Sequence, residues 1–435
     1  MTRLPTLLPP QLATQILEDS RIVVLEGDIT LENLGLNNDT LSELRDSVSI
    51  CVHAASSLNL KANLQKTTKS VIQPSMAFAA LALEFRELKR FVFVSTAYTN
   101  AFKHFLPLDD GVRQDCHLEE RVYHLPTGNA QRDPFLELEE IEQTGDTPEY
   151  SRVPHPFAYA YAKHLTERLL LSMFEKEGKQ RLLTILRPSC FGPAESEPFP
   201  HFETPGSAPA TSVLCVALAS LPKKALFTSN LADPSKATLD EVPVDIVVNR
   251  LIAHVAYETP GCVHAVSGES GRRPIQDMIH AALDLRRWWW PAPRIVWCSE
   301  ATDQKKVCAM SKIFRLCGCS FLFSDVKTAD IWSRMDDHDR EKWNLWTRRN
   351  PNDFSDLAIR SHTAGVVLQE WLLKRHKIPP RITQILIPEK RLAAEIESRN
   401  VGAERQRVPR PQDVCEKRLG GTVVYVKVVE ETEAC

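Results

Sequence analysis

Four short apolar runs, rich in β-branched side chains, constrain the fold of this chain more than any other feature. They lie at residues 22–30, 47–55, 91–95 and 181–186 of a chain of 435 residues. Short apolar runs of this kind are typical of strands that are buried on both faces. Because patterns typical of helices separate them, the sequence predicts an α/β fold with a doubly wound parallel sheet. Such sheets bind ligands at the carboxyl ends of their strands.

The segments between the runs predict the crossover helices. Residues 61–87 have helical spacing, with an interruption or kink expected at Pro74. Residues 157–177 carry a stripe of leucine, methionine and phenylalanine at helical spacing. Residues 103–156 are polar, acidic and interrupted by proline, which indicates an excursion over the sheet edge, such as a lid. Residues 242–257 predict a further helix.

Composition divides the chain into four parts. Residues 1–20 contain three prolines and are expected to be irregular, and residues 21–285 form the predicted α/β domain. Residues 290–376 are rich in aromatic residues at helical spacing, which predicts a smaller helical C-terminal domain. Residues 377–435 are a tail whose role the pattern does not indicate, with a strand-like stretch at 423–428.

The charge and the cysteines narrow the class of protein. The chain has 53 Lys and Arg against 56 Asp and Glu, a formal net charge of -3, so it lacks the basic field that nucleic acids require. Its 11 cysteines are scattered, without a CxxC pair or a zinc-ligand spacing, and are expected to be reduced intracellular thiols rather than metal ligands. Cys190 is expected to be a packed thiol rather than a nucleophile. The pair Cys317 and Cys319 lacks two further ligands for zinc and is expected to be structural or incidental.

No targeting or membrane-spanning segment is expected. The first 20 residues lack the apolar region of a signal peptide, and no run of 18 apolar residues occurs. We therefore expect an intracellular protein that is cytoplasmic or peripheral on an organelle membrane. The oligomeric state cannot be read from the sequence.

One aromatic run leaves several partners open. RRWWWPAPR spans residues 286–294, and three adjacent tryptophans spread over about 200° of a helix, so they cannot all face one core. Packing against the helical domain or an acyl channel is one interpretation. Peripheral membrane contact through Trp288–Trp290 is another, and binding to nucleic acid has the least support.

Tyr159 and Lys163 are the residues that best fit a chemical function. Four residues apart on the predicted helix, they would lie about 5–6 Å from each other, so the ammonium could lower the phenol pKa from about 10. Ser95 and Thr96, at the end of a predicted strand, could orient a substrate carbonyl while the tyrosine protonates it. This chemistry requires a nicotinamide. A surface pair beside a buried strand-end threonine explains the same spacing.

Six segments together resemble the fatty acyl-CoA reductases of the extended short-chain dehydrogenase/reductase superfamily. The resemblance covers roughly residues 20–375. The segments occur in family order: GDITLENLGL (27–36), CVHAAS (51–56), FVFVSTAYTN (91–100), YAYAKHLTE (159–167), RPSCFGPAESEPFP (187–200) and VPVDIVVN (242–249).

The resemblance implies a reaction and a site. The reaction would be NADPH-dependent reduction of a long-chain acyl-CoA to the aldehyde or primary alcohol. Tyr159 would be the proton donor, Lys163 its activator and ribose anchor, and Thr96 the hydroxyl that orients the carbonyl, with Ser95 beside it. The implied cofactor contacts are Asp28 at the adenine end, Ala54 and Ala55 between the phosphates and the nicotinamide, and Pro188 and Ser189 near the nicotinamide.

Two departures from the family pattern affect these expectations. No glycine precedes Gly27, so the first strand and the G-x-x-G-x-x-G turn that holds the pyrophosphate are absent. We therefore expect an N-terminally truncated member with an incomplete Rossmann-like sheet, weak cofactor binding and an exposed strand edge. Where the family commonly has an asparagine that supports the lysine, Gln73 could substitute. The alternative is a catalytically silent remnant that binds acyl chains, membranes or a partner.

Overall fold

The computed structural model describes most of the chain. The described residues are 8–107, 115–127, 132–204, 206–219, 224–285, 291–299, 307, 311, 315–376 and 423–428.

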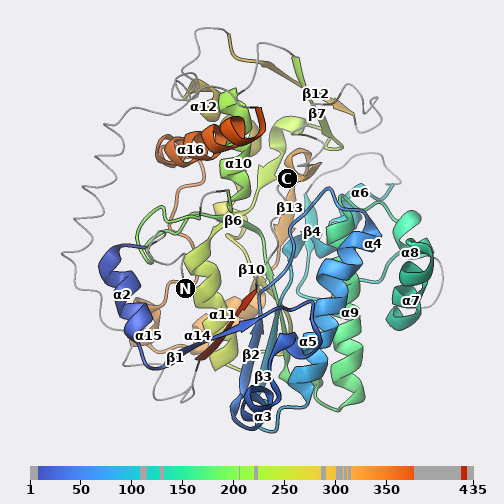
Figure 1. The fold of residues 1–435 in the computed structure, drawn as a ribbon. Coiled ribbons are helices and arrows are strands. Elements are labelled where there is room, and N and C mark those ends of the chain that lie inside the picture. Colours follow the sequence, from blue (N-terminus) through green and yellow to red (C-terminus); the bar gives the residue numbers. More distant parts are fainter. Residues whose placement is uncertain are drawn as a thin grey trace.

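A four-stranded parallel sheet forms the centre of the fold (Figure 1). Its order is β10 (Gly261–Ala265), β5 (Leu183–Pro188), β3 (Arg90–Val94) and β2 (Ile50–His53). All three neighbouring pairs are parallel. The predictions of an α/β class and of a parallel sheet are therefore confirmed.

Helices cover both faces of this sheet. Phe91 and Phe93 of β3 pack with α5 (Gln73–Leu83) and α9 (Ala158–Lys176) on one face. Val92, between them, packs with Leu186 and with α11 (Val244–Ala256) on the other face. Alternate side chains of a strand point to opposite faces, so this apolar strand fills two cores at once. The sheet is doubly wound, as the sequence predicts.

The first crossover helix is interrupted before Pro74. It consists of α4 (Leu64–Thr67), a π-helical turn (Thr68–Ile72) that packs against α9, and α5. Proline has no N–H to donate to the carbonyl four residues earlier, which breaks the regular hydrogen-bond ladder. The predicted interruption at Pro74 is confirmed.

Strand β1 (Ile22–Gly27) lies outside the four-stranded sheet. It pairs in parallel with β14 (Val423–Val428), from Ile22 opposite Val423 to Gly27 opposite Val428 (Figure 1). Among the strands that the structure describes, β2 has β3 as its one partner, and its Val52 is 42% exposed. The strand-like pattern at 423–428 and the expected exposed edge are both found.

The N-terminal segment is not irregular throughout. Helix α2 spans Pro10–Glu18, with Ala13 buried on its inner side. A proline in the first turn costs no hydrogen bond, because the first N–H groups of a helix have no partner inside it. The prolines therefore mark the start of this helix rather than preventing it.

The excursion between β3 and α9 has regular structure. It contains α6 (Phe102–Phe105), β4 (Cys116–Leu118), α7 (Pro134–Thr144) and α8 (Pro148–Ser151). Helix α7 packs against α9 and ends at Gly145, whose φ of 83° is the left-handed conformation that suits a helix C-terminus. The excursion is therefore more regular than the sequence indicated, because apolar side chains among its acidic residues, such as Leu138 and Ile141, are buried on one side of a helix.

The segment 290–376 is not a separate helical domain. It includes β12 (Arg294–Ser299), which pairs with β7 (Lys224–Ser229), and β13 (Phe321–Phe323), which pairs with β4. Its helices are α14 (Val326–Arg334), α15 (Asp337–Lys342) and α16 (Asp356–His376). Helix α16 shares one apolar core with α10 (Pro209–Ala219) and α12 (Ile275–Asp284).

A buried ion pair also ties α16 to the α/β part, because Arg360 contacts Glu241 at 2.8 Å. Glu241 belongs to β9 (Glu241–Pro243), which pairs with β6 (Cys190–Gly192). The remaining strand pair is β8 (Thr238–Leu239) with β11 (Arg273–Pro274), and α3 (Asn38–Ser47) connects β1 to β2. The 3-10 turns span Glu32–Gly35, Ala97–Asn100, Gln180–Leu182, Pro234–Lys236, Glu269–Gly271 and Arg315–Gly318.

Candidate active site

Tyr159 and Lys163 lie in the first turns of α9, as the spacing predicts. The Lys163 Nζ is 5.7 Å from the centre of the Tyr159 ring. Phe157 has extended backbone geometry, so helix α9 begins at Ala158 and Tyr159 is the second residue of the helix. The two side chains therefore share one face at the N-terminal end of α9.

The Lys163 ammonium is buried against the end of β3. It is 1% exposed, and its Nζ donates a hydrogen bond of 3.0 Å to the Val94 carbonyl. The Phe93 ring centre lies 4.6 Å away. Burial lowers the pKa of Lys163 to about 7, and the negative charge of Glu167 opposes that change. This cation therefore lies in a largely apolar environment at the strand end.

The phenol of Tyr159 has a pKa that departs from our expectation. Burial raises it above the ordinary value of 10.0, whereas we expected Lys163 to lower it. The lysine ammonium donates to the Val94 carbonyl instead. The Ser56 hydroxyl lies close enough to lower the tyrosine pKa, although it makes no hydrogen bond of ordinary geometry. The neutral phenol is thus favoured at this position.

Thr96 and Ser95 follow β3 but differ in their surroundings. Thr96 is half-buried, and its hydroxyl accepts a long hydrogen bond of 3.4 Å from the Tyr98 N–H. Ser95 is 6% exposed, and its hydroxyl donates to the Glu167 carboxylate at 2.6 Å. Ser95 therefore supports the strand end from inside the protein. Of the two, Thr96 has the hydroxyl better placed for a ligand.

The structure contains a buried ion pair beneath Lys163 that the sequence analysis did not predict. The guanidinium of Arg187 contacts the Glu167 carboxylate through two hydrogen bonds, of 2.6 and 2.9 Å. Both side chains are 0% exposed. Glu167 is one helical turn after Lys163, and Arg187 is in β5. The pair therefore fixes α9 to the sheet directly beneath the candidate site.

Most of the predicted cofactor contacts lie at the ends of adjacent strands. Ala54 is exposed and Ala55 half-buried, just after β2. Pro188 ends β5 opposite Ala265 of β10. Ser189 follows it, and its hydroxyl donates to the Asp240 carboxylate at 2.5 Å. Because the strands are parallel neighbours, these residues lie at the same edge of the sheet as Thr96.

Asp28 is at the end of a different sheet. It follows β1, and its Oδ1 accepts hydrogen bonds from the Thr30 hydroxyl at 2.7 Å and the Thr30 N–H at 2.8 Å. These bonds lower the pKa of Asp28. The structure therefore does not bring Asp28 into the row of strand ends that holds the other predicted residues.

The structure changes the expected role of Gln73 and adds His53 to the surroundings of Lys163. Gln73 does not support Lys163, because it is exposed and donates to Glu142 at 2.7 Å. His53, which the sequence analysis missed, is 3% exposed and shares a 2.9 Å hydrogen bond with the Ser75 hydroxyl. Burial and the nearby charge of Lys163 lower the pKa of His53 to about 3. His53 is therefore neutral near neutral pH.

Cys190 is a packed thiol. Burial raises the pKa of the Cys190 thiol well above its ordinary value, so a thiolate nucleophile is disfavoured. Among the described residues, no group of three or more His, Cys, Asp or Glu is arranged to hold a metal ion. In that same part of the chain, no helix is long and apolar enough to cross a membrane.

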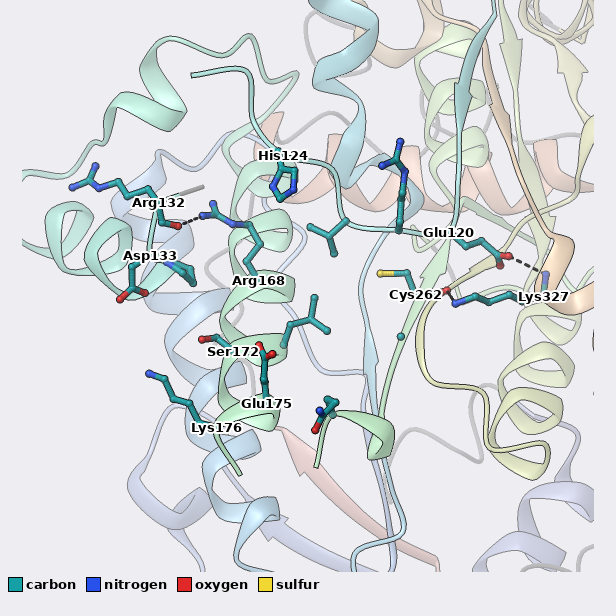
Figure 2. A pocket seen from close by; sticks show the side chains of 16 residues that line it. Glu120, His124, Arg132, Asp133, Arg168, Ser172, Glu175, Lys176, Cys262 and Lys327 are labelled. Atoms are coloured by element: carbon teal, nitrogen blue, oxygen red, sulfur yellow. Dashed lines mark hydrogen bonds between the residues drawn. The ribbon is translucent and has the colours of Figure 1, made fainter. Parts of the chain in front are cut away.

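A groove of about 770 Å³ lies away from this site. Figure 2 shows Arg168, Ser172 and Lys176 of α9 on one side of it, with Glu120 and Lys327 on the other. Its lining includes none of the three predicted catalytic residues. The predicted membrane contact, Trp288–Trp290, lies outside the described residues.

Comparison with known proteins bears on this site. A model of a NAD-binding family described as male sterility protein matches residues 2–251. The chain belongs to this family. Its match includes α9, the four predicted strands and the residues at their ends.

Similar sequences carry names that fit the resemblance. A Drosophila melanogaster protein whose name marks it as a candidate fatty acyl-CoA reductase is 27% identical over 59% of this chain and 44% of its own length. Fatty acyl-CoA reductase 1 of Gallus gallus is 27% identical over 54% of this chain and 42% of its own. The Homo sapiens protein of the same name is 26% identical over the same shares. The matched stretch thus spans less than half the length of these relatives.

Solved structures show weaker likeness. The terminal R domain of the myxalamid biosynthetic pathway has a TM-score of 0.47 and 14% identity, over 87% of this chain and 80% of that domain. The UDP-Glc/GlcNAc 4-epimerase of Campylobacter jejuni has a TM-score of 0.45 and 13% identity, over 83% and 88%.

Proposed function

We propose that this protein reduces a long-chain acyl-CoA with NADPH, to the aldehyde or the primary alcohol. The observation that carries the proposal is the buried ammonium of Lys163 beside Tyr159, at the carboxyl ends of the parallel strands. Strand ends of this kind are where α/β sheets bind ligands. The family match and the names of the relatives support the same reaction.

Each catalytic residue has a role that its surroundings support. Tyr159 gives its proton to the carbonyl oxygen of the substrate, and burial suits this role because it keeps the phenol protonated. Thr96 orients that carbonyl through its hydroxyl. Lys163 holds the ribose hydroxyls with the ammonium protons that Val94 does not take. The bound nicotinamide supplies the hydride.

The described residues fit the two ends of this cofactor unequally. At the nicotinamide end, the ammonium of Lys163 can donate to the cofactor. The buried hydroxyl of Ser56 makes no regular hydrogen bond among the described residues and can also donate. Pro188, Ser189, Ala54 and Ala55 would line this end, and Asp28 the adenine end. Residues 8–26 contain no glycine, so a Gly-rich turn is absent from that stretch.

The reaction is tested by substitution of Tyr159. Tyr159→Phe should lower the rate of palmitoyl-CoA-dependent NADPH oxidation by about 100-fold or more, because it removes the proton donor. The matched control is Tyr161→Phe, two residues along α9, whose hydroxyl donates to Glu137 at 3.0 Å instead. Equal rates for wild type and Tyr159→Phe would remove Tyr159 from the mechanism.

A second candidate function is a catalytically silent protein that binds acyl chains, a membrane or a partner. The exposed side chains of Val23 and Val52 favour it. It predicts binding of palmitoyl-CoA without any saturable binding of NADPH. We place either function inside the cell, in the cytoplasm or peripheral on an organelle membrane.

A further inference from the structure

Asp240 connects two loops at the edge of the sheet where the candidate site lies. It is the residue between β8 and β9. Its Oδ1 accepts three hydrogen bonds: from the Ser189 hydroxyl at 2.5 Å, the Ser267 N–H at 2.8 Å and the Ser267 hydroxyl at 3.0 Å. Ser189 follows β5, and Ser267 lies just beyond β10. One carboxylate oxygen therefore joins the ends of two neighbouring strands.

The environment of this carboxylate is unusual for a residue that only supports the fold. Asp240 is 3% exposed, and its second oxygen, Oδ2, has no hydrogen-bond partner among the described residues. Burial raises the pKa of Asp240, while Ser189 and Ser267 act in the opposite direction. A buried acceptor without a partner costs free energy. Such a cost is often kept where a site needs the geometry that results.

The backbone around Ser189 gives the side-chain bond a specific effect. The Cys190 N–H donates to the Asp240 carbonyl at 3.1 Å, and the Ser189 N–H donates to Ala265 at 3.2 Å. The side chain of Asp240 adds a contact that joins the Ser189 and Ser267 side chains, so it fixes the orientation of these serines on strand ends whose backbones are already paired. Without it, the backbone bonds hold each loop but the serine side chains are free to turn.

The charge of Asp240 also acts on the turn that follows Thr96. Tyr98, two residues after Thr96, has a raised pKa mainly because it is buried, and the charge of Asp240 adds to this rise. The other ionisable groups that act on Asp240 or respond to it are Arg250 and Cys190. The carboxylate therefore joins the ends of β5 and β10 near the turn that follows Thr96.

We propose that Asp240 is a positioning residue for the nicotinamide end of the site, acting by holding Ser189 against Ser267. This inference rests on the proposed function, because it assumes that a nicotinamide binds beside Ser189. It adds a residue that touches neither substrate nor cofactor. Its effect is on the affinity for the cofactor rather than on proton transfer.

The test compares five variants of the full chain. Asp240→Ala should raise the NADPH dissociation constant about tenfold, measured by NADPH fluorescence, because a charge-assisted hydrogen bond is lost. Ser189→Ala should have a similar effect. The dissociation constant of the double variant should be no higher than that of either single variant, because both substitutions remove the same contact. Asp240→Asn keeps an acceptor oxygen and should stay within about threefold of wild type. Asp233→Ala is the control, since the side chain of exposed Asp233 bonds to Ser235 within the connection between β7 and β8.

A second measurement needs no cofactor. Hydrogen exchange of the peptide covering residues 186–192 should be faster in Asp240→Ala than in Asp233→Ala, because the serine loop has lost its anchor. If the wild type binds NADPH and Asp240→Ala binds it equally well, the positioning role is refuted even if the melting temperature falls. Additive effects in the double variant would refute the route through Ser189. If the wild type does not bind NADPH at all, the proposed function fails, and this inference fails with it.

Discussion

The four-stranded sheet and the pair formed by β1 and β14 are held in very different ways. In the four-stranded sheet, β3 and β5 are paired on both sides and are buried on both faces. The pair β1 and β14 has two strands, and Val23 in β1 is 43% exposed. Sheets of two strands have little stability of their own. The first system therefore provides a rigid frame and the second does not.

This difference separates the two ends of the cofactor site. Thr96, Pro188 and Ser189 lie at the ends of the rigid strands, and Lys163 is buried against one of them. Asp28, the residue expected at the adenine end, follows β1. The residues that we propose for the nicotinamide end are thus preorganised, whereas Asp28, the residue predicted for the adenine end, follows a strand of the weaker pair.

The largest expected effect is on the buried ion pair under the site. Glu167→Ala should lower the free energy of unfolding by about 3–5 kcal/mol, because it leaves Arg187 buried without its counter-charge. The control is Glu84→Ala, which breaks an exposed ion pair with Arg45 and should cost about 1 kcal/mol or less. Chemical denaturation measures both. Similar losses for the two variants would show that the frame is not rigid here.

A pair of strand substitutions tests the comparison directly. Leu186→Ala in β5 should lower the free energy of unfolding by about 2–5 kcal/mol, since it opens a cavity in a buried core. Val23→Ala in β1 should cost less than about 1 kcal/mol, because that side chain is 43% exposed. Denaturant titration again gives the two values. A larger loss for Val23→Ala than for Leu186→Ala would reverse the order of the two systems.

The smallest effect is a change in the pH dependence of stability. Burial, with the charge of Lys163, lowers the pKa of His53 from 6.5 to about 3 in the folded protein. The unfolded chain therefore binds a proton that the folded chain does not, and stability falls as the pH drops from 6.5 toward 3.

His53→Gln should reduce the slope of stability against pH in this window by about 1.4 kcal/mol per pH unit, the effect of one proton. Val52→Ala, on the same strand, is the control and should keep the wild-type slope. An unchanged slope in His53→Gln would mean that this histidine is not buried in its neutral form.

Local patterns predicted the frame of the fold but not its tertiary contacts. The run FVFV predicted β3 because its side chains pack into the cores on the two faces of the sheet. Pro74 predicted the interruption of the first crossover helix. The helices of residues 134–151 and the pairing of β12 with β7 were missed, since they depend on partners far away in the chain.

The candidate site shows the same division between local patterns, which could be predicted, and contacts between distant residues, which could not. Tyr159 and Lys163 are one helical turn apart, so their placement on one face could be predicted. Glu167 and Arg187 meet only through the packing of α9 on β5, and Asp240 reaches Ser189 from 51 residues away. No local spacing indicates such pairs. The pKa of Tyr159 was also misjudged, because burial outweighs a neighbouring cation that donates elsewhere.

Binding of NADPH tests the central claim, that the rigid strand ends and Lys163 still form a nicotinamide site. We expect saturable binding to the full chain by NADPH fluorescence, weakened about tenfold or more in Lys163→Met, which loses a buried charge-assisted contact. Lys176→Met, at the exposed end of the same helix, should bind like wild type. Absence of saturation up to about millimolar NADPH, a limit of very weak affinity, would contradict the account.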